Sequence, residues 1–176
     1  RDTEKVLINN KDAYERAKEL VQSFSPCQSG TLKYYDLSVS MLDFYGLESE
    51  ILRALERKVW LKSGGYIVID QTEALTAIDV NTGKYIGSSN LEQTVLDINL
   101  EAASEIALQI RLRDIGGIII IDFIDMDEES HKMMILDKLK EQLKKDRTKS
   151  SVLEITQLGL VEMTRKKISK RLSLVI

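Results

Sequence analysis

Two kinds of hydrophobic pattern alternate along the chain, and together they predict an α/β protein. Short apolar runs bounded by turn residues predict strands near residues 5–9, 32–35, 59–61, 66–69, 74–80, 118–123, 152–156 and 160–163. Apolar residues spaced three and four apart predict helices at 10–23, 48–57 and 90–113, a helix from Asp127 to about Lys145, and a basic helix after the last strand. The expected fold class is therefore α/β (α+β), a mixed sheet with flanking helices.

Polar residues at the ends of these patterns indicate where the helices begin and stop. Asn10, Asn90 and Asp127 are the expected N-caps, and Gln93 completes a capping box with Asn90. The pair Gly116-Gly117 is expected to end the third helix. The expected inward-facing residues are Ile51, Leu52 and Leu55 on the second helix and Leu91, Val95, Ile98, Ala102 and Ile106 on the third.

The character of the chain changes near residue 58, where the hairpin signature Lys62-Ser63-Gly64-Gly65 lies between two apolar runs. We therefore expect two parts, residues 1–57 with a β-α-β-α order and residues 58–176 with the remaining strands. The chain begins at Arg1 without a methionine and closes on an apolar run, so we expect it to be a piece of a longer protein.

Composition and charge narrow the class of protein. Of the 176 residues, 30% are charged and 43% hydrophobic, an ordinary globular balance. No segment approaches the ~20 consecutive apolar residues that cross a membrane. The lone Cys27 cannot form an internal disulfide, which suits a reducing, cytoplasmic compartment. The net charge of −3 gives no overall attraction to nucleic acid, although basic residues gather late in the chain.

Two aspartates at strand ends are the strongest candidate chemistry. Asp79 and Asp122 each follow an apolar, strongly β-forming run, where an unpaired carboxylate is costly. The two runs and the helix between them form a β-α-β unit, so a right-handed crossover brings both strand ends to one side of the sheet. Because side chains alternate along a strand, Asn81 is expected to point the same way as Asp79.

An oxygen-only pair of this kind suits Mg²⁺ or Mn²⁺ and predicts metal-assisted phosphodiester chemistry. The alternative is that each aspartate only forms a turn or a cap, and the residues alone leave the two interpretations balanced. Asp70 and Asp125 are expected to be structural. Asp97, Glu101 and Glu105 are expected to form a solvated helix face.

The basic residues form two groups after the candidate site. The first contains Lys149, and the second contains Arg165 and Lys166. Either group can be a solvated helix end or a surface for a phosphate backbone. His131, the only histidine, has no cysteine or acidic partner at metal-ligand spacing and is expected on a helix surface.

Several long, ordered motifs resemble the catalytic region of the ribonuclease E/G family. The resemblance covers about residues 45–172 strongly and the first 45 residues more loosely. The motifs are SGGYIVIDQTEALTAIDVN (63–81), NLEAA (99–103), RLRDIGG (111–117), IDFIDM (121–126) and LGLVEMTR (158–165).

The resemblance implies an Mg²⁺-dependent endoribonuclease that cuts single-stranded RNA in RNA processing and decay, leaving 5′-phosphate and 3′-hydroxyl ends. It implies that residues 58–176 are a deoxyribonuclease I-like catalytic subdomain in which Asp79 and Asp122 hold the metal. By the same similarity Asn81 helps to orient the attacked phosphate. Residues 1–57 then correspond to part of an RNase H-like subdomain.

With single-stranded RNA as the implied partner, Lys149, Arg165 and Lys166 become the candidate RNA-binding residues. The family's upstream RNA-binding domain, its 5′-end sensor and its zinc link are absent from this chain. We expect the full-length protein to be a homo-oligomer, a dimer.

The sequence leaves open the choice between E-like and G-like subtypes, the natural RNA targets, and the activity of this stretch by itself. Two alternatives to an endoribonuclease also stay open. One is a truncated, non-catalytic RNA-binding or assembly module. The other is a metal phosphoesterase that acts on DNA or small phosphate esters.

Overall fold

The computed structural model describes residues 4–24, 30–83, 91–156 and 158–168. The chain divides into two compact units, Arg1–Ile51 and Leu52–Ile176. The division falls slightly before the boundary at 57/58 that the sequence predicts, and it lies inside a short helix. None of the described helices is long and apolar enough to cross a membrane.

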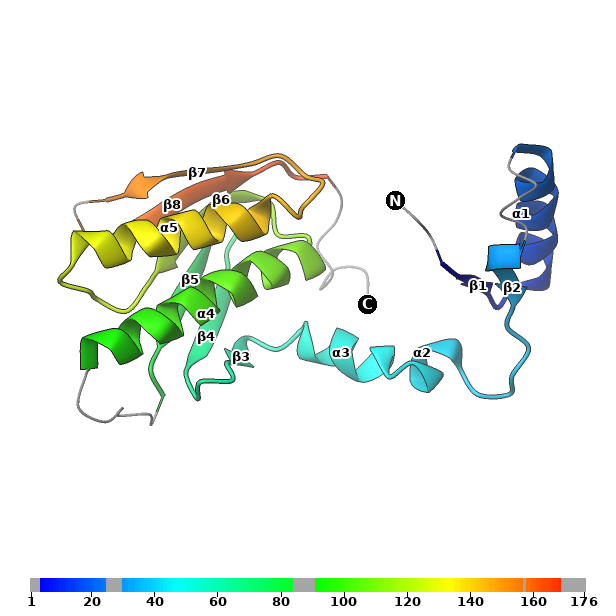
Figure 1. Cartoon of the computed structure of the whole chain (residues 1–176), viewed down its shortest axis with the longest axis horizontal. Helices are drawn as coiled ribbons and strands as arrows, with labels where there is room; N and C mark the ends of the chain where they lie inside the picture. Colours follow the sequence, from blue (N-terminus) through cyan, green and yellow to red (C-terminus); the bar gives the residue numbers. More distant parts are fainter. Residues whose placement is uncertain (1–3, 25–29, 84–90, 157, 169–176) are drawn as a thin grey trace. The chain divides into compact units, whose positions relative to one another are not determined.

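The first unit contains a small parallel sheet with one helix as its crossover (Figure 1). Asn10 caps that helix as predicted, because its Oδ1 accepts a hydrogen bond from the backbone N–H of Ala13 at 2.9 Å. The loop predicted at 25–30 lies outside the described residues except for Gly30. The elements, in chain order, are β1 (Val6–Ile8), α1 (Lys11–Phe24), β2 (Leu32–Tyr34), α2 (Met41–Phe44) and α3 (Leu47–Arg53).

The helix predicted at 48–57 is shorter than expected and presents no buried face. It ends at Arg53, none of its residues is buried, and Leu52 is 58% exposed, so the predicted inward position of Leu52 is wrong. Helix α2 was not predicted. Both helices are too short for a hydrophobic repeat to fix their ends.

The second unit is built on a six-stranded mixed sheet in the order β3-β4-β5-β6-β8-β7. Strands β5 and β6 are parallel, and every other neighbouring pair is antiparallel. The predicted hairpin and the predicted β-α-β unit are both confirmed. The strands are β3 (Lys58–Trp60), β4 (Tyr66–Gln71), β5 (Leu75–Asn81), β6 (Gly117–Asp122), β7 (Ser150–Ile155) and β8 (Leu160–Arg165).

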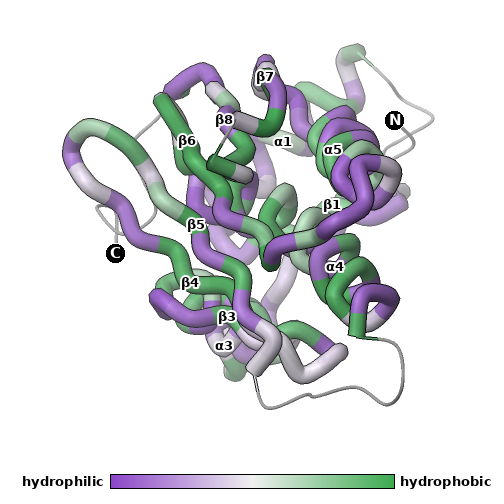
Figure 2. The backbone as a smooth tube through the Cα atoms, turned by 90° about the vertical axis from the view of Figure 1, so that its left-hand side faces the viewer, coloured by the Kyte–Doolittle hydropathy of each residue, from purple (hydrophilic) through white to green (hydrophobic). Residues whose placement is uncertain are grey.

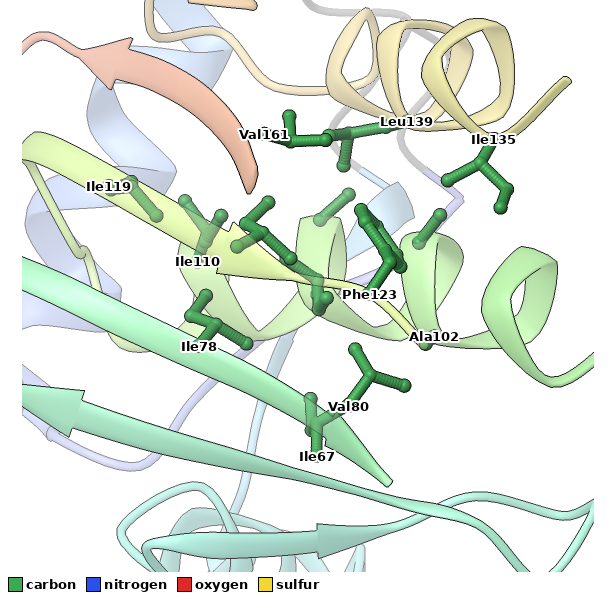
Figure 3. Close-up of a cluster of buried hydrophobic side chains, with 14 of the residues drawn as sticks. Ile67, Ile78, Val80, Ala102, Ile110, Ile119, Phe123, Ile135, Leu139 and Val161 are labelled. Carbon is green, nitrogen blue, oxygen red and sulfur yellow. The ribbon is translucent and has the colours of Figure 1, made fainter. Parts of the chain in front are cut away.

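Two helices, α4 (Leu91–Leu112) and α5 (Glu129–Leu143), cover one face of this sheet. Figure 2 shows both helices on the same side of the strands. Between the helices and the sheet lies a core of mostly branched aliphatic side chains (Figure 3). Its fully buried large residues include Ile67, Ile78, Ile106, Ile110, Ile119, Ile121, Ile135, Leu139 and Val161. Burying such side chains is the main stabilising contribution, at roughly 1.5–3 kcal/mol each.

No described helix of the second unit covers the opposite face of the sheet. Strand β6 therefore alternates: Ile119 and Ile121 are buried, whereas Ile118 is 52% exposed. The strand predicted at 118–123 is therefore fully buried only on the side that faces the helices. One covered and one open face are common in sheets with antiparallel edges.

Helix α4 ends at an aspartate in the left-handed region rather than at the glycine pair. Asp114 has φ +48°, and the N–H of Ile115 donates to the carbonyl of Ile110 at 2.9 Å, which closes a Schellman-type turn. Ile115 is fully buried and seals the turn. Aspartate tolerates this conformation better than most residues, and here its carboxylate also accepts a hydrogen bond from Arg165 at 2.7 Å.

Other predicted helix ends need correction. Leu91 is 67% exposed rather than inward, and Asn90 lies outside the described residues. The N-cap of α5 is Glu128 instead of Asp127, and its side chain makes no capping hydrogen bond. Residues 166–168 are not helical, and the rest of the predicted C-terminal basic helix lies outside the described residues.

Glu101 ties α4 to the β3–β4 hairpin instead of facing solvent. The backbone N–H groups of Lys62 and Ser63 donate to its two carboxylate oxygens at 2.6 and 3.0 Å. Partial burial raises the pKa of Glu101, but hydrogen bonds from Ser63 and Lys62 outweigh it and hold this pKa below its usual value. The carboxylate therefore stabilises the hairpin at neutral pH and loses that effect as the pH falls through its lowered pKa.

We expect Glu101→Ala to lower the free energy of unfolding by about 1–2 kcal/mol, because two charge-assisted hydrogen bonds to the turn are lost. Urea unfolding measures this loss, and it should shrink in acid as the parent carboxyl is protonated. Asp97→Ala is the matched control, since the exposed Asp97 accepts from Gln93 on its own helix. Equal effects of the two substitutions would contradict the role given to Glu101.

Candidate metal site on the open face of the sheet

Asp79 and Asp122 lie directly opposite each other on neighbouring parallel strands. The register of β5 and β6 pairs their Cα atoms at the C-terminal ends of both strands. Their neighbours Ile78, Val80 and Ile121 are buried toward the helices, so both carboxylates project from the open face. Adjacent strands are about 4.8 Å apart, and two carboxylates at that separation can share one divalent ion.

Asn81 lies beside the pair on the same face. Its Nδ2 donates a hydrogen bond to Asp79 Oδ2 at 2.7 Å. This contact fixes the orientation of the amide and leaves its second N–H and its carbonyl oxygen for further ligands. The alternation of β5 therefore places Asn81 and Asp79 together as the sequence predicts.

The electrostatics of the site favour a cation. Burial raises the pKa of the Asp122 carboxyl, and the negative charges of Asp79 and Asp125 raise it further. A pKa raised by neighbouring carboxylates marks repulsion that a bound cation relieves. Two carboxylates and an amide oxygen are donors that Mg²⁺ and Mn²⁺ accept, with the remaining positions left for water and phosphate. The residues present therefore fit such an ion.

Asp125 contributes to this site electrostatically, contrary to the purely structural role expected for it. It follows Ile124, whose backbone is held on both sides by the buried Asn99 of α4. Asn99 Nδ2 donates to the Ile124 carbonyl at 2.8 Å, and Asn99 Oδ1 accepts from the Ile124 N–H at 3.1 Å. Asn99 thereby fixes the segment that brings Asp125 near Asp122, a positioning role that no local pattern in the sequence indicates.

A cavity of about 540 Å³ adjoins this segment, between α5 and the β7–β8 turn. Asp125 forms part of its wall, together with Lys132, Thr156 and Gly159. Lys132 is already paired with Glu129 at 2.6 Å. The cavity therefore places polar groups beside Asp125, whereas Asp79 and Asp122 do not line it.

Lys149 and Lys166 lie together, at the end of the sheet away from the aspartates. The Lys166 N–H donates to the Lys149 carbonyl at 3.0 Å, and both side chains are exposed. Asp122 pairs with Leu160, whereas Arg165 pairs with Gly117 at the other end of β6. Gly117 and Asp122 are five positions apart along β6, which is about 17 Å. A nucleic-acid strand bound at the aspartates would therefore have to extend about 17 Å along the sheet to reach these lysines.

The burial of Arg165 is at odds with the RNA-binding role expected for it. Its side chain is 3% exposed and lies between Asp146 and Asp114, at 2.8 and 2.7 Å. It also donates to the Ile115 carbonyl at 2.8 Å and to Thr148 Oγ1 at 3.2 Å. Arg165 occupies an inward position of β8, after Val161 and Met163, so we assign it to the fold.

Asp70 is structural, as expected, because Arg57 donates to it at 2.7 Å. His131 differs from expectation. Its ring nitrogens lie 3.4 Å from Glu92 and 3.5 Å from Glu128, and its side chain is 16% exposed. Among the described residues this trio is the group of three whose potential ligand atoms all fall within 4.8 Å. Glu92 and Glu128 lie at the N-terminal ends of α4 and α5, where the helix dipole favours carboxylates. Glu92 is distant from His131 in sequence, so spacing alone does not reveal this contact.

Comparisons with known proteins identify the family of the chain. The model of the ribonuclease E/G family matches residues 1–168. Ribonuclease G of Salmonella typhimurium is 48% identical over 164 residues, which cover 93% of this chain and 34% of that protein. Ribonuclease G of Haemophilus influenzae is 47% identical over 173 residues, covering 98% of the chain and 35% of that protein. Ribonuclease E of Haemophilus influenzae is 41% identical over 172 residues, covering 98% and 18%.

The chain is therefore a mixed α/β polypeptide that belongs to the ribonuclease E/G family. It spans only 34% of the length of the first of these relatives.

Proposed function

We propose that this chain carries the catalytic site of an Mg²⁺-dependent endoribonuclease that hydrolyses single-stranded RNA to 5′-phosphate and 3′-hydroxyl ends. Membership of the ribonuclease E/G family supports the class of reaction. The observation that carries the mechanism is the register pairing of Asp79 with Asp122 on the open face. The setting is RNA processing and decay in the cytoplasm, and the full-length protein acts as a homo-oligomer, a dimer.

Each residue of the site has a distinct task. Asp79 and Asp122 would hold the divalent ion through one carboxylate each, and Asn81 would orient the attacked phosphate. When bound, Mg²⁺ supplies positive charge at the phosphoryl oxygen and lowers the pKa of the attacking water. Asn81 is already fixed by its bond to Asp79, so little reorganisation is needed when the phosphate arrives. Asp125 adds negative charge near Asp122, which strengthens cation binding.

Cleavage of a short 5′-monophosphorylated single-stranded RNA tests this proposal. We expect cleavage with Mg²⁺ or Mn²⁺ and none in EDTA, and the downstream product should accept ligation at its 5′ end without prior phosphorylation. Asp79→Asn and Asp122→Asn should lose cleavage. Asp70→Asn is their matched control, because Asp70 is also a strand-end carboxylate but pairs with Arg57. Cleavage in EDTA would contradict the metal mechanism.

The same assay separates the alternatives. RNA binding without cleavage would favour a non-catalytic RNA-binding or assembly module, since the chain spans 34% of its ribonuclease G relative. Turnover of duplex DNA but not RNA would favour a phosphoesterase of different specificity.

A further inference from the structure

An aromatic pair stands on the open face of the sheet beside the candidate metal site. Trp60 on β3 and Tyr66 on β4 are cross-strand partners, with ring centroids 5.3 Å apart and planes inclined by 62°. Trp60 is 60% exposed. A single exposed apolar side chain needs no explanation, so the argument depends on what surrounds this pair.

A lysine places a positive charge over both rings. The Nζ atom of Lys58 lies 4.0 Å from the ring centroid of Trp60 and 3.5 Å from that of Tyr66. These cation–π contacts hold the ammonium group at the open face. Lys58, Trp60 and Tyr66 together form what we call the aromatic platform, which presents flat apolar surface and a cation in one place. Trp60 is 60% exposed even though the Lys58 ammonium group lies over its ring.

The sheet register connects the aromatic platform to the candidate metal site. One row of paired residues runs from Trp60 through Tyr66 to Asn81. The adjacent row runs from Lys58 through Val68 and Asp79 to Asp122. Paired residues share a face, so the platform and the carboxylates all project from the open face. Trp60 on β3 and Asn81 on β5 are separated by the single strand β4, so their backbones lie about 10 Å apart.

From this arrangement we infer that the aromatic platform is a binding subsite for one unpaired RNA base, which stacks on the exposed ring of Trp60 while Lys58 contacts the adjoining phosphate. The inference rests on the proposed function and adds to it how the strand is held over Asp79 and Asp122. Aromatic side chains on an open sheet face are a general means of binding single-stranded RNA. Every base has a π-face, so the subsite tolerates different sequences.

The chemistry favours a single strand over a duplex. Within a duplex both faces of each base are covered by neighbouring bases, so a ring of the protein has nothing to stack on. An unpaired base offers a free face, and its phosphate supplies the negative charge that complements Lys58. The subsite therefore accounts for strand selection with residues next to the site.

The chain carries its own reporter for this subsite, because Trp60 is the only tryptophan. The whole chain is titrated in EDTA, which prevents metal-dependent cleavage, with a short fluorescein-labelled single-stranded RNA. Anisotropy of the label gives Kd, and a parallel titration with unlabelled RNA follows tryptophan emission. An abasic ribose-phosphate oligomer of equal length is the control that keeps the charge and removes the bases.

We expect the RNA to quench Trp60 with the same midpoint as the anisotropy change, and the abasic oligomer to leave emission unchanged. Trp60→Ala should weaken RNA binding roughly 5- to 150-fold, because loss of one base–aromatic stack costs about 1–3 kcal/mol. Trp60→Phe should retain most of the affinity. Neither variant should change binding of the abasic oligomer. Circular dichroism confirms that each variant is folded.

Several outcomes would overturn the inference. Equal RNA affinity of the parent and Trp60→Ala would make the pair only a cross-strand contact that stabilises the hairpin. Absence of RNA binding, or binding without quenching, would also contradict it. The result is separable from the proposed function: quenching in a parent that never cleaves RNA supports the subsite but not the nuclease. Cleavage that depends on Asp79, with no Trp60 effect, supports the nuclease but not the subsite.

Discussion

Replacing Asp122 with asparagine is expected to lower Mg²⁺-dependent RNA cleavage about 10²- to 10³-fold. An interaction that stabilises the transition state through a preorganised charge is worth about 3–4 kcal/mol, and each 1.36 kcal/mol is a factor of ten in rate. Asparagine preserves the size of the side chain, so the loss reports the charge. Single-turnover cleavage at saturating protein measures it, with Asp70→Asn as the matched control.

The same substitution should not destabilise the metal-free fold. The pKa of Asp122 is raised by burial and by Asp79 and Asp125. A carboxyl whose folded-state pKa lies above its unfolded value opposes folding at neutral pH, and this opposition disappears as the pH falls below the unfolded value. Asp122→Asn should therefore unfold at an equal or higher urea concentration than the parent at pH 7. Lost cleavage together with clear destabilisation would point to a structural role instead.

Replacing Arg165 with methionine is expected to cost about 3–5 kcal/mol of stability, because it leaves a buried carboxylate without its partner. The Asp146 side chain is 5% exposed, and it accepts from Arg165 at 2.8 Å. The left-handed Asp114 at the end of α4 loses its guanidinium partner as well. Urea unfolding followed by Trp60 emission measures the loss within the second unit.

Two controls separate charge from packing at Arg165. Arg165→Lys keeps a positive charge but not the planar fork, so an intermediate loss is expected. Adding Asp146→Asn to Arg165→Met should recover part of the stability by neutralising the stranded carboxylate. A loss below about 1 kcal/mol, or reduced RNA affinity at unchanged stability, would restore an RNA-binding role for Arg165.

This network also sets an acid limit on stability. Partial burial raises the pKa of Asp146, but hydrogen bonds from Arg165 and Thr148 outweigh it and hold this pKa below its usual value. The network is therefore fully stabilising above the ordinary carboxyl range and is lost as the pH falls through the lowered pKa.

The essential geometry of the candidate site could be predicted from local pattern. Asp79 and Asp122 each lie at the end of an apolar run, and one long helix joins the two runs. This order predicts a right-handed parallel β-α-β unit with both carboxylates at one edge of the sheet. Strand alternation then adds Asn81. The structure confirms each of these placements, while the catalytic roles stay proposals.

What the sequence could not supply depends on contacts between distant residues. His131 is held against Glu92 because the N-terminal ends of two helices meet, and nothing near either residue signals this. Asn99 fixes Ile124 in the same long-range way. Arg165 is different, because the alternation Val161, Met163, Arg165 already indicated an inward position. The surrounding lysines instead suggested a basic surface.

The central claim is that Asp79 and Asp122 act together through one divalent ion, and a double-mutant cycle on cleavage tests it most directly. Rates are measured with and without Mg²⁺ for the parent, Asp79→Asn, Asp122→Asn and the double variant. Groups that act as a unit give strongly non-additive losses. We predict that the double variant is no slower than the slower single variant, and that the parent cleaves only with the ion. Losses that multiply, or parent cleavage without a divalent ion, would contradict the claim.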